Sequence, residues 1–153
     1  MQVEFINPFL ESIVHVLETM ADVKATPGKP QRKEEDTAQG DVTGVIGMAS
    51  EQAKGSLAIT FSSAAIFDIA RRMLGEEVTE INNTVTDLVG EITNMVTGGA
   101  KRGLAEQGYD FDMAIPAVIA GKNHRISHKS NGMKIIIPFS IIAGKFYVEV
   151  CFE

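Results

Sequence analysis

The chain has 153 residues, a net charge of −6 at neutral pH and an apolar fraction of 44%. A chain of this length can form a hydrophobic core that needs no disulfide or metal for stability, so we expect one domain over residues 1–153. The acidic balance argues against a nucleic-acid partner, and the absence of a signal peptide and of any long apolar run predicts a cytoplasmic protein without a membrane span.

A first helix is predicted to open at Asn7 and Pro8 and to end near Asp22. Asn7 is a suitable N-cap, and proline is tolerated in the first turn of a helix. The helical spacing predicts an apolar stripe made of Phe9, Ile13, Val16, Leu17 and Met20. His15 lies within this helix and is expected to be a structural or surface residue.

Residues 23–40 are expected to start as a short strand and to continue as a polar, mobile hairpin loop. Two prolines and a glycine between residues 27 and 30 interrupt regular structure, and residues 32–36 form a run of mixed charge. Nothing in the sequence selects a recruitment role for this loop.

Residues 41–50 and 55–61 predict an antiparallel strand pair because β-branched and aromatic residues are frequent in both. A short helix follows, with Ser62 or Ser63 as its N-cap and Gly75 as its stop signal. Its expected apolar residues are Ile66, Phe67, Ile69, Ala70, Met73 and Leu74.

The long helix that follows, over residues 84–104, is the most distinctive segment of the chain. Its predicted buried face consists of Val85, Leu88, Val89, Ile92, Val96 and Ala100. Asp87, Glu91 and Asn94 are spaced at i, i+4 and i+7, so they form one polar stripe on the opposite face. Gly98 leaves the next turn of this stripe without a side chain, which suggests a place where a partner docks.

A simpler explanation of the stripe is that its side chains are only solvated, as most polar residues on exposed helical faces are. The pattern Glu-x-x-Asn is also weak, since it occurs at Glu4/Asn7, Glu80/Asn83 and Glu91/Asn94. Only the third pair lies inside a long helix. The residues of the second pair lie where helix-capping groups are expected.

The remainder of the chain predicts strands over residues 114–120, 133–140 and 145–152. Asn131 and Gly132 are a strong tight-turn signal before the second of these strands. Cys151 falls in the last strand and is expected to be an inert buried thiol.

The sequence contains little other chemistry. His124 and His128 are four residues apart in a basic loop without a nearby carboxylate or thiol, so no metal site is expected. We find no P-loop and no convincing Ser/His/Asp or Cys/His nucleophile. Gly98 and Gly99 are expected to permit close helix packing.

The helix with Asp87, Glu91, Asn94 and Gly98-Gly99, followed by Pro116, resembles the CheC/CheX/FliY family of phosphatases that act on the chemotaxis regulator CheY. Residues 7–9, 116–124, 137–139 and 148–153 extend the resemblance over essentially the whole chain. The predicted helix over residues 63–74 lacks a second Glu-x-x-Asn, which favours the CheX members with one site per subunit.

This resemblance implies an α/β (α+β) fold with two long helices packed on an antiparallel sheet, in a homodimer joined through the sheets. The implied substrate is a phosphorylated CheY-type receiver that holds its own Mg²⁺, so this chain needs no metal or cofactor. Asn94 would orient the attacking water, Glu91 would pair with the receiver's active-site lysine, and Asp87 and Gly98 would contact the partner. The alternative is a non-catalytic CheY-binding or flagellar-switch-like protein of the same fold.

Overall fold

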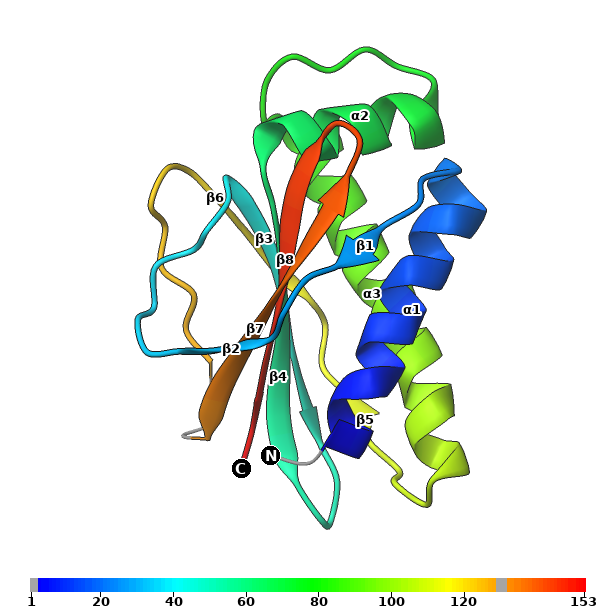
Figure 1. Ribbon diagram of the computed structural model, residues 1–153, viewed down its shortest axis with the longest axis vertical. Coiled ribbons are helices and arrows are strands. Elements are labelled where there is room, and N and C mark those ends of the chain that lie inside the picture. Colours follow the sequence, from blue (N-terminus) through cyan, green and yellow to red (C-terminus); the bar gives the residue numbers. More distant parts are fainter. Residues whose placement is uncertain (1–2, 129–131) are drawn as a thin grey trace.

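The computed structural model describes residues 3–128 and 132–153, and over these residues the chain forms three helices and one eight-stranded antiparallel sheet (Figure 1). The helices are α1 (Val3–Ala21), α2 (Ser63–Leu74) and α3 (Asn83–Glu106). The strands are β1 (Thr26–Pro27), β2 (Gln31–Lys33), β3 (Val42–Ala49), β4 (Lys54–Phe61), β5 (Asp112–Met113), β6 (Ala117–Ala120), β7 (Met133–Ile141) and β8 (Gly144–Phe152). The expected α+β architecture is confirmed.

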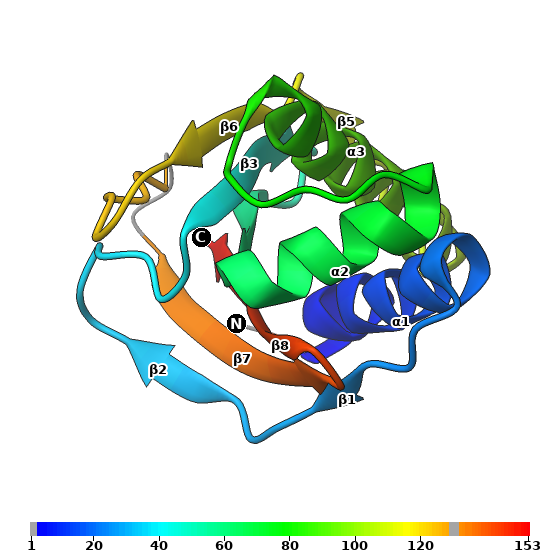
Figure 2. The ribbon, with the colours of Figure 1, turned by 90° about the horizontal axis from the view of Figure 1, so that it is seen from above.

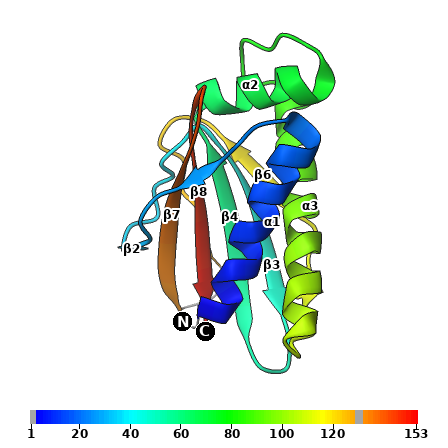
Figure 3. The ribbon, with the colours of Figure 1, turned by 45° about the vertical axis from the view of Figure 1, so that its right-hand side comes forward.

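The sheet has the order β1-β7-β8-β4-β3-β5, with β2 also paired to β7 and β6 also paired to β3. Its centre consists of two long hairpins, β3–β4 and β7–β8, which meet where β4 pairs with β8. Helices α1 and α3 lie side by side on one face, and α2 crosses one end (Figures 1 and 3). Seen from above, the segments around β2 and after β6 lie on the opposite face (Figure 2).

The main core lies between the sheet and the helices. Every residue predicted for the buried face of α3 is buried. The largest fully buried side chains of the sheet and its flanks are Phe61, Phe111, Phe139 and Phe146. Burying one side chain of this size contributes roughly 1.5–3 kcal/mol, so this layer is the main source of stability.

Among the described residues, none of the helices is both long and apolar enough to traverse a lipid bilayer.

Helix α1 begins at Val3, so the prediction that it opens at Asn7 and Pro8 is wrong, and Pro8 lies inside it. The expectation that only Glu91/Asn94 lies inside a long helix is wrong for the same reason, because Glu4 and Asn7 are both residues of α1. The reason is tertiary packing: the Phe5 ring is buried, with its centroid 4.8 Å from that of Tyr109 and 5.1 Å from that of Phe152. These contacts offset the backbone hydrogen bond that a proline removes. The predicted apolar stripe of α1 is confirmed at Phe9, Ile13, Val16 and Leu17, which are buried, but Met20 is 48% exposed.

The stretch over residues 23–40 starts with a short strand, β1, as expected, but the part expected to be a loop contains a second short strand, β2. Both strands pair with β7, with Thr26 opposite Ser140 and Arg32 opposite Ile135. Such short edge strands lack an alternating pattern long enough to be predicted from sequence.

The turn and cap predictions have mixed outcomes. Ser62 caps α2, and Gly75 ends it in the left-handed conformation with φ of 71°. The N-cap of α3 is Asn82, and neither Glu80 nor Asn83 has that role. The predicted turn at Asn131 lies outside the described residues.

Candidate functional site

The polar stripe of α3 lies on the surface, as its spacing predicts. Asp87, Glu91 and Asn94 are all exposed. Successive helical residues are about 100° apart, so Glu91 and Asn94 project on either side of the same exposed ridge. The amide and the carboxylate are therefore available together to a partner that approaches this ridge.

The helix that presents these groups is held tightly from behind. Gly44 of β3 has no side chain, and a Cβ atom there would collide with Thr93 of α3. On the other flank, a Cβ at Gly99 would collide with Ser12 of α1, whose hydroxyl donates a hydrogen bond of 2.7 Å to the Val96 carbonyl. These close approaches fix α3 between β3 and α1.

The adjacent glycines of α3 have different surroundings. Gly99 permits close packing against α1, as the sequence predicts for both residues. A Cβ at Gly98 would meet nothing within 4 Å, so Gly98 faces open space one turn beyond Asn94. The ridge is therefore bare at this turn, and a partner's backbone has room to approach it.

A groove lies between α1 and α3, next to the ridge. It has a volume of about 210 Å³. Helix α1 contributes Glu11, Ser12 and His15, and α3 contributes Met95 and Arg102. His15 is expected to be a structural or a surface residue, and in the structure it is exposed.

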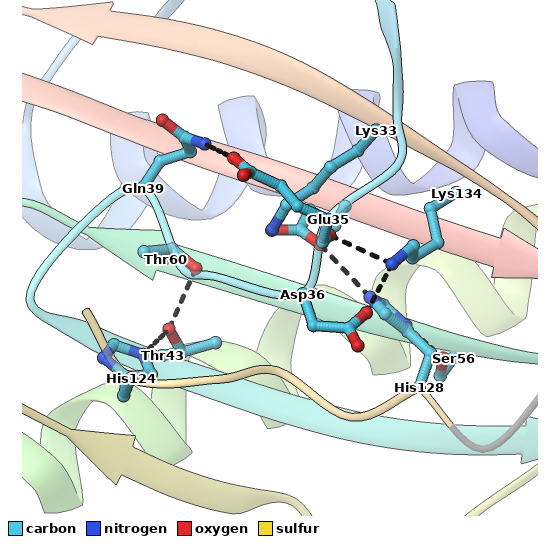
Figure 4. Close-up of polar contacts among 11 residues, drawn as sticks. Lys33, Glu35, Asp36, Gln39, Thr43, Ser56, Thr60, His124, His128 and Lys134 are labelled. Carbon is cyan, nitrogen blue, oxygen red and sulfur yellow. Dashed lines mark hydrogen bonds and ion pairs between the residues drawn. The ribbon is translucent and has the colours of Figure 1, made fainter.

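A second cluster of chemically active side chains lies on the opposite face of the sheet (Figure 4). The Lys33 ammonium group lies 2.7 Å from the Glu149 carboxylate, and the two side chains are 3% and 1% exposed. The other oxygen of Glu149 lies 3.2 Å from Nε2 of His128, whose Nδ1 contacts the Ser56 hydroxyl. The expectation that no carboxylate lies near His128 is therefore wrong, because Glu149 is far away in the sequence.

The chain of contacts from Ser56 through His128 to Glu149 resembles a hydrolytic triad, but its burial differs from that of an active site. A nucleophile must be reached by its substrate, and the Ser56 side chain is buried in the sheet. Glu149 is already neutralised by Lys33. The cluster therefore joins β2, β4 and β8 to the segment after β6, with no accessible nucleophile.

The other histidine is also held by protein groups. Nε2 of His124 contacts the Thr43 hydroxyl, which lies 2.9 Å from that of Thr60 (Figure 4). Nδ1 of His124 lies 2.7 Å from the Gly121 carbonyl oxygen. Within residues 3–128 and 132–153, no three His, Cys, Asp or Glu side chains are arranged to hold a metal ion. Cys151 is buried, as predicted, and its thiol donates to the Gly132 carbonyl at 3.2 Å.

Two segments cover this face of the sheet, residues 34–40 and 121–128. They are joined by hydrogen bonds from the Ala38 amide to the His124 carbonyl (2.8 Å) and from the Ile126 amide to the Asp36 carbonyl (2.7 Å). A hydrogen bond from Lys134 and its positive charge, with the help of Arg125, hold the pKa of the Asp36 carboxyl below its usual value.

Comparison with known proteins matches residues 42–140 to the family described as chemotaxis phosphatase CheX. The CheY-P phosphatase CheX of Thermotoga maritima is 24% identical over 144 residues, which are 94% of this chain and 91% of that protein. The crystal structure of the chemotaxis protein CheX from Vibrio vulnificus is 54% identical with a TM-score of 0.91, and the match covers 98% of this chain and 99% of that one. A chain of the CheX–CheY–BeF₃–Mg²⁺ complex from Borrelia burgdorferi is 26% identical with a TM-score of 0.83, and the match covers 99% of both chains.

Proposed function

This chain belongs to the chemotaxis phosphatase CheX family, and on that premise we propose that it dephosphorylates a CheY-type response regulator. The observation that supports this function most strongly is the family match, which spans β3 to β7 and includes the whole of α3. The relative from Borrelia burgdorferi forms a complex with CheY, BeF₃ and Mg²⁺. In this proposal the Mg²⁺ belongs to the receiver, and this chain supplies only side chains.

Asn94 is the proposed catalytic residue. Water attacks the phosphorus atom of the receiver's aspartyl phosphate, and the bond from phosphorus to the aspartate oxygen breaks to give inorganic phosphate and a free carboxylate. A carboxamide both accepts and donates hydrogen bonds and does not titrate, so it can hold the water in line without acting as a base. The exposure of Asn94 on a helix held by β3 and α1 supports this role.

Glu91 is proposed to fix the approach of the receiver. Its carboxylate would form a charge-assisted contact with the receiver's active-site lysine. Asp87 would extend the acidic surface one turn earlier, and the bare turn at Gly98 would admit the receiver's backbone.

The alternative is a non-catalytic protein that binds the same regulator, like a flagellar switch protein. The exposed pairing of an amide with a carboxylate on α3 favours catalysis, since binding alone does not require a water-orienting amide. A turnover assay separates the two functions. Catalytic amounts of an enzyme accelerate phosphate release from the receiver, whereas a pure binding protein does not.

The proposed mechanism is tested by kinetics on phosphorylated receiver. Asn94→Ala should reduce kcat about a hundredfold or more while retaining much of the affinity. Asn94→Asp should be no better, because it loses the donor and brings negative charge toward the phosphoryl group. Glu91→Ala should raise KM as well as lower kcat/KM.

The matched control is Asn83→Ala, which removes an exposed amide from the first turn of the same helix. It should leave kcat nearly unchanged. All four variants should stay within about 0.5 kcal/mol of wild-type stability, because these side chains are exposed. Full phosphatase activity of a folded Asn94→Ala protein would refute the mechanism.

A further inference from the structure

The groove between α1 and α3 is lined by Met95, the residue that follows Asn94. The function proposed above gives this groove no role. Building on the function proposed above, we propose that this groove is a specificity site for the receiver. It accepts an apolar side chain of the receiver, with a receiver carboxylate placed on Arg102. Glu91 and Asn94 would then perform chemistry at one end of a longer contact surface.

The position of the groove follows from helical geometry. Met95 is the residue after Asn94 and lies one turn beyond Glu91, so it borders the ridge on the side that faces α1. Arg102 lies one turn beyond the bare position at Gly98. A partner that contacts both Glu91 and Gly98 therefore also lies next to Met95 and Arg102.

A stable complex must also bury more surface than the ridge offers, so the receiver must contact the groove or the opposite flank of α3 as well. A specific protein interface buries roughly 800 Å² on each partner, which is more than the exposed ridge of one helix provides. On the flank toward β6, Val118 lies 3.5 Å from where a Gly90 Cβ would be, so a side chain covers that side of Gly90. The flank toward α1 is hollow, with about 210 Å³ available.

The chemistry of the groove specifies its occupant. Its lining combines the apolar side chains of Met95 and Val16 with the charged side chains of Glu11 and Arg102. Methionine adapts its shape to a hydrophobic side chain, and Glu11 disfavours an acidic group on its own side of the groove. Arg102 is exposed at the rim, and no described residue forms an ion pair with it. A guanidinium group matches a carboxylate through two parallel hydrogen bonds. An apolar side chain beside an acidic one therefore fits this groove.

The test uses a CheY-type receiver that the wild-type chain dephosphorylates, loaded with Mg²⁺ and beryllofluoride so that no turnover occurs. Binding is measured by titration calorimetry. Arg102→Glu should weaken binding by about tenfold or more, and Met95→Ala by about fivefold. The matched controls are Lys54→Glu, an exposed charge reversal on β4, and Leu74→Ala, an exposed apolar truncation on α2. Both controls should bind within about twofold of wild type, the range expected away from an interface.

Steady-state kinetics supply a second readout. The groove variants should raise KM with kcat at saturation nearly unchanged, the opposite of Asn94→Ala. Added salt should weaken wild-type binding more than binding by Arg102→Gln, because only the wild type retains the charge.

The outcomes separate the two proposals. If the wild-type chain turns over the receiver but both groove variants bind as tightly as their controls, the groove inference is wrong and the proposed function stands. If the wild-type chain dephosphorylates none of the CheY-type receivers offered, the proposed function fails, and the groove inference fails with it.

Discussion

Replacing Lys33 with methionine should cost far more stability than a lysine substitution on an edge strand usually does. In the native state its ammonium group lies 2.7 Å from the Glu149 carboxylate, and the two side chains are 3% and 1% exposed. The Lys33→Met variant would leave a carboxylate buried without its countercharge. Removing one partner of a buried ion pair destabilises a protein by about 3–5 kcal/mol.

This loss is a large share of the total stability of a domain of this size, which is about 5–15 kcal/mol. It corresponds to a decrease in Tm of roughly 6–20 °C. Urea unfolding followed by circular dichroism, at one fixed protein concentration, should show a lower midpoint with an unchanged m value. The double variant Lys33→Met/Glu149→Leu should be more stable than Lys33→Met alone, because no unpaired charge remains.

The neighbouring residue on β2 is the matched control. Arg32 lies 3.8 Å from Glu34, and these side chains are 67% and 81% exposed. Arg32→Met should change the free energy of unfolding by less than about 1 kcal/mol, as expected for a surface pair. If Lys33→Met and Arg32→Met are equally stable, the buried pair does not hold β2 to the sheet and the reasoning is wrong.

Three further predictions concern packing, pH and assembly. Gly98→Ala should stabilise the protein by up to about 1 kcal/mol because its Cβ meets open space, whereas Gly99→Ala should destabilise it by colliding with α1; urea unfolding compares the two. Because Lys134 and Arg125 lower the pKa of Asp36, its contribution is complete above the usual aspartate pKa and lost as pH falls through the lower folded-state pKa. Stability measured below about pH 4 should therefore decline more steeply for wild type than for Asp36→Asn. We also propose that the chain is a homodimer joined through its sheets, and light scattering that shows a monomer at micromolar concentration would contradict this.

The parts of the fold that were predictable are those whose signal is local. The helical period of α3 identifies its buried face and its exposed stripe from neighbouring residues alone. The end of α1 near Asp22 is predicted correctly, but the start of the helix is not. That start depends on Phe5 packing against Tyr109 and Phe152, which are about a hundred or more residues away in the sequence.

The same distinction applies to the candidate site. The exposure of Asp87, Glu91 and Asn94 follows from spacing and is confirmed. The groove beside them depends on how α1 lies against α3, which no local pattern specifies. The partnership of His128 with Glu149 likewise depends on sheet pairing, so no local pattern indicates a carboxylate near that histidine.

The strand order has a consequence for how the chain reaches its native state. The strands β1 and β2 pair with β7, and β4 pairs with β8. The first strands of the sequence therefore complete their pairing only when the last two strands are present. Contacts between residues this distant in sequence slow folding, because a long loop must close before they form. During synthesis, β4 would present an open edge until residues 144–152 leave the ribosome. We expect the nascent chain to be most prone to aggregation in that interval.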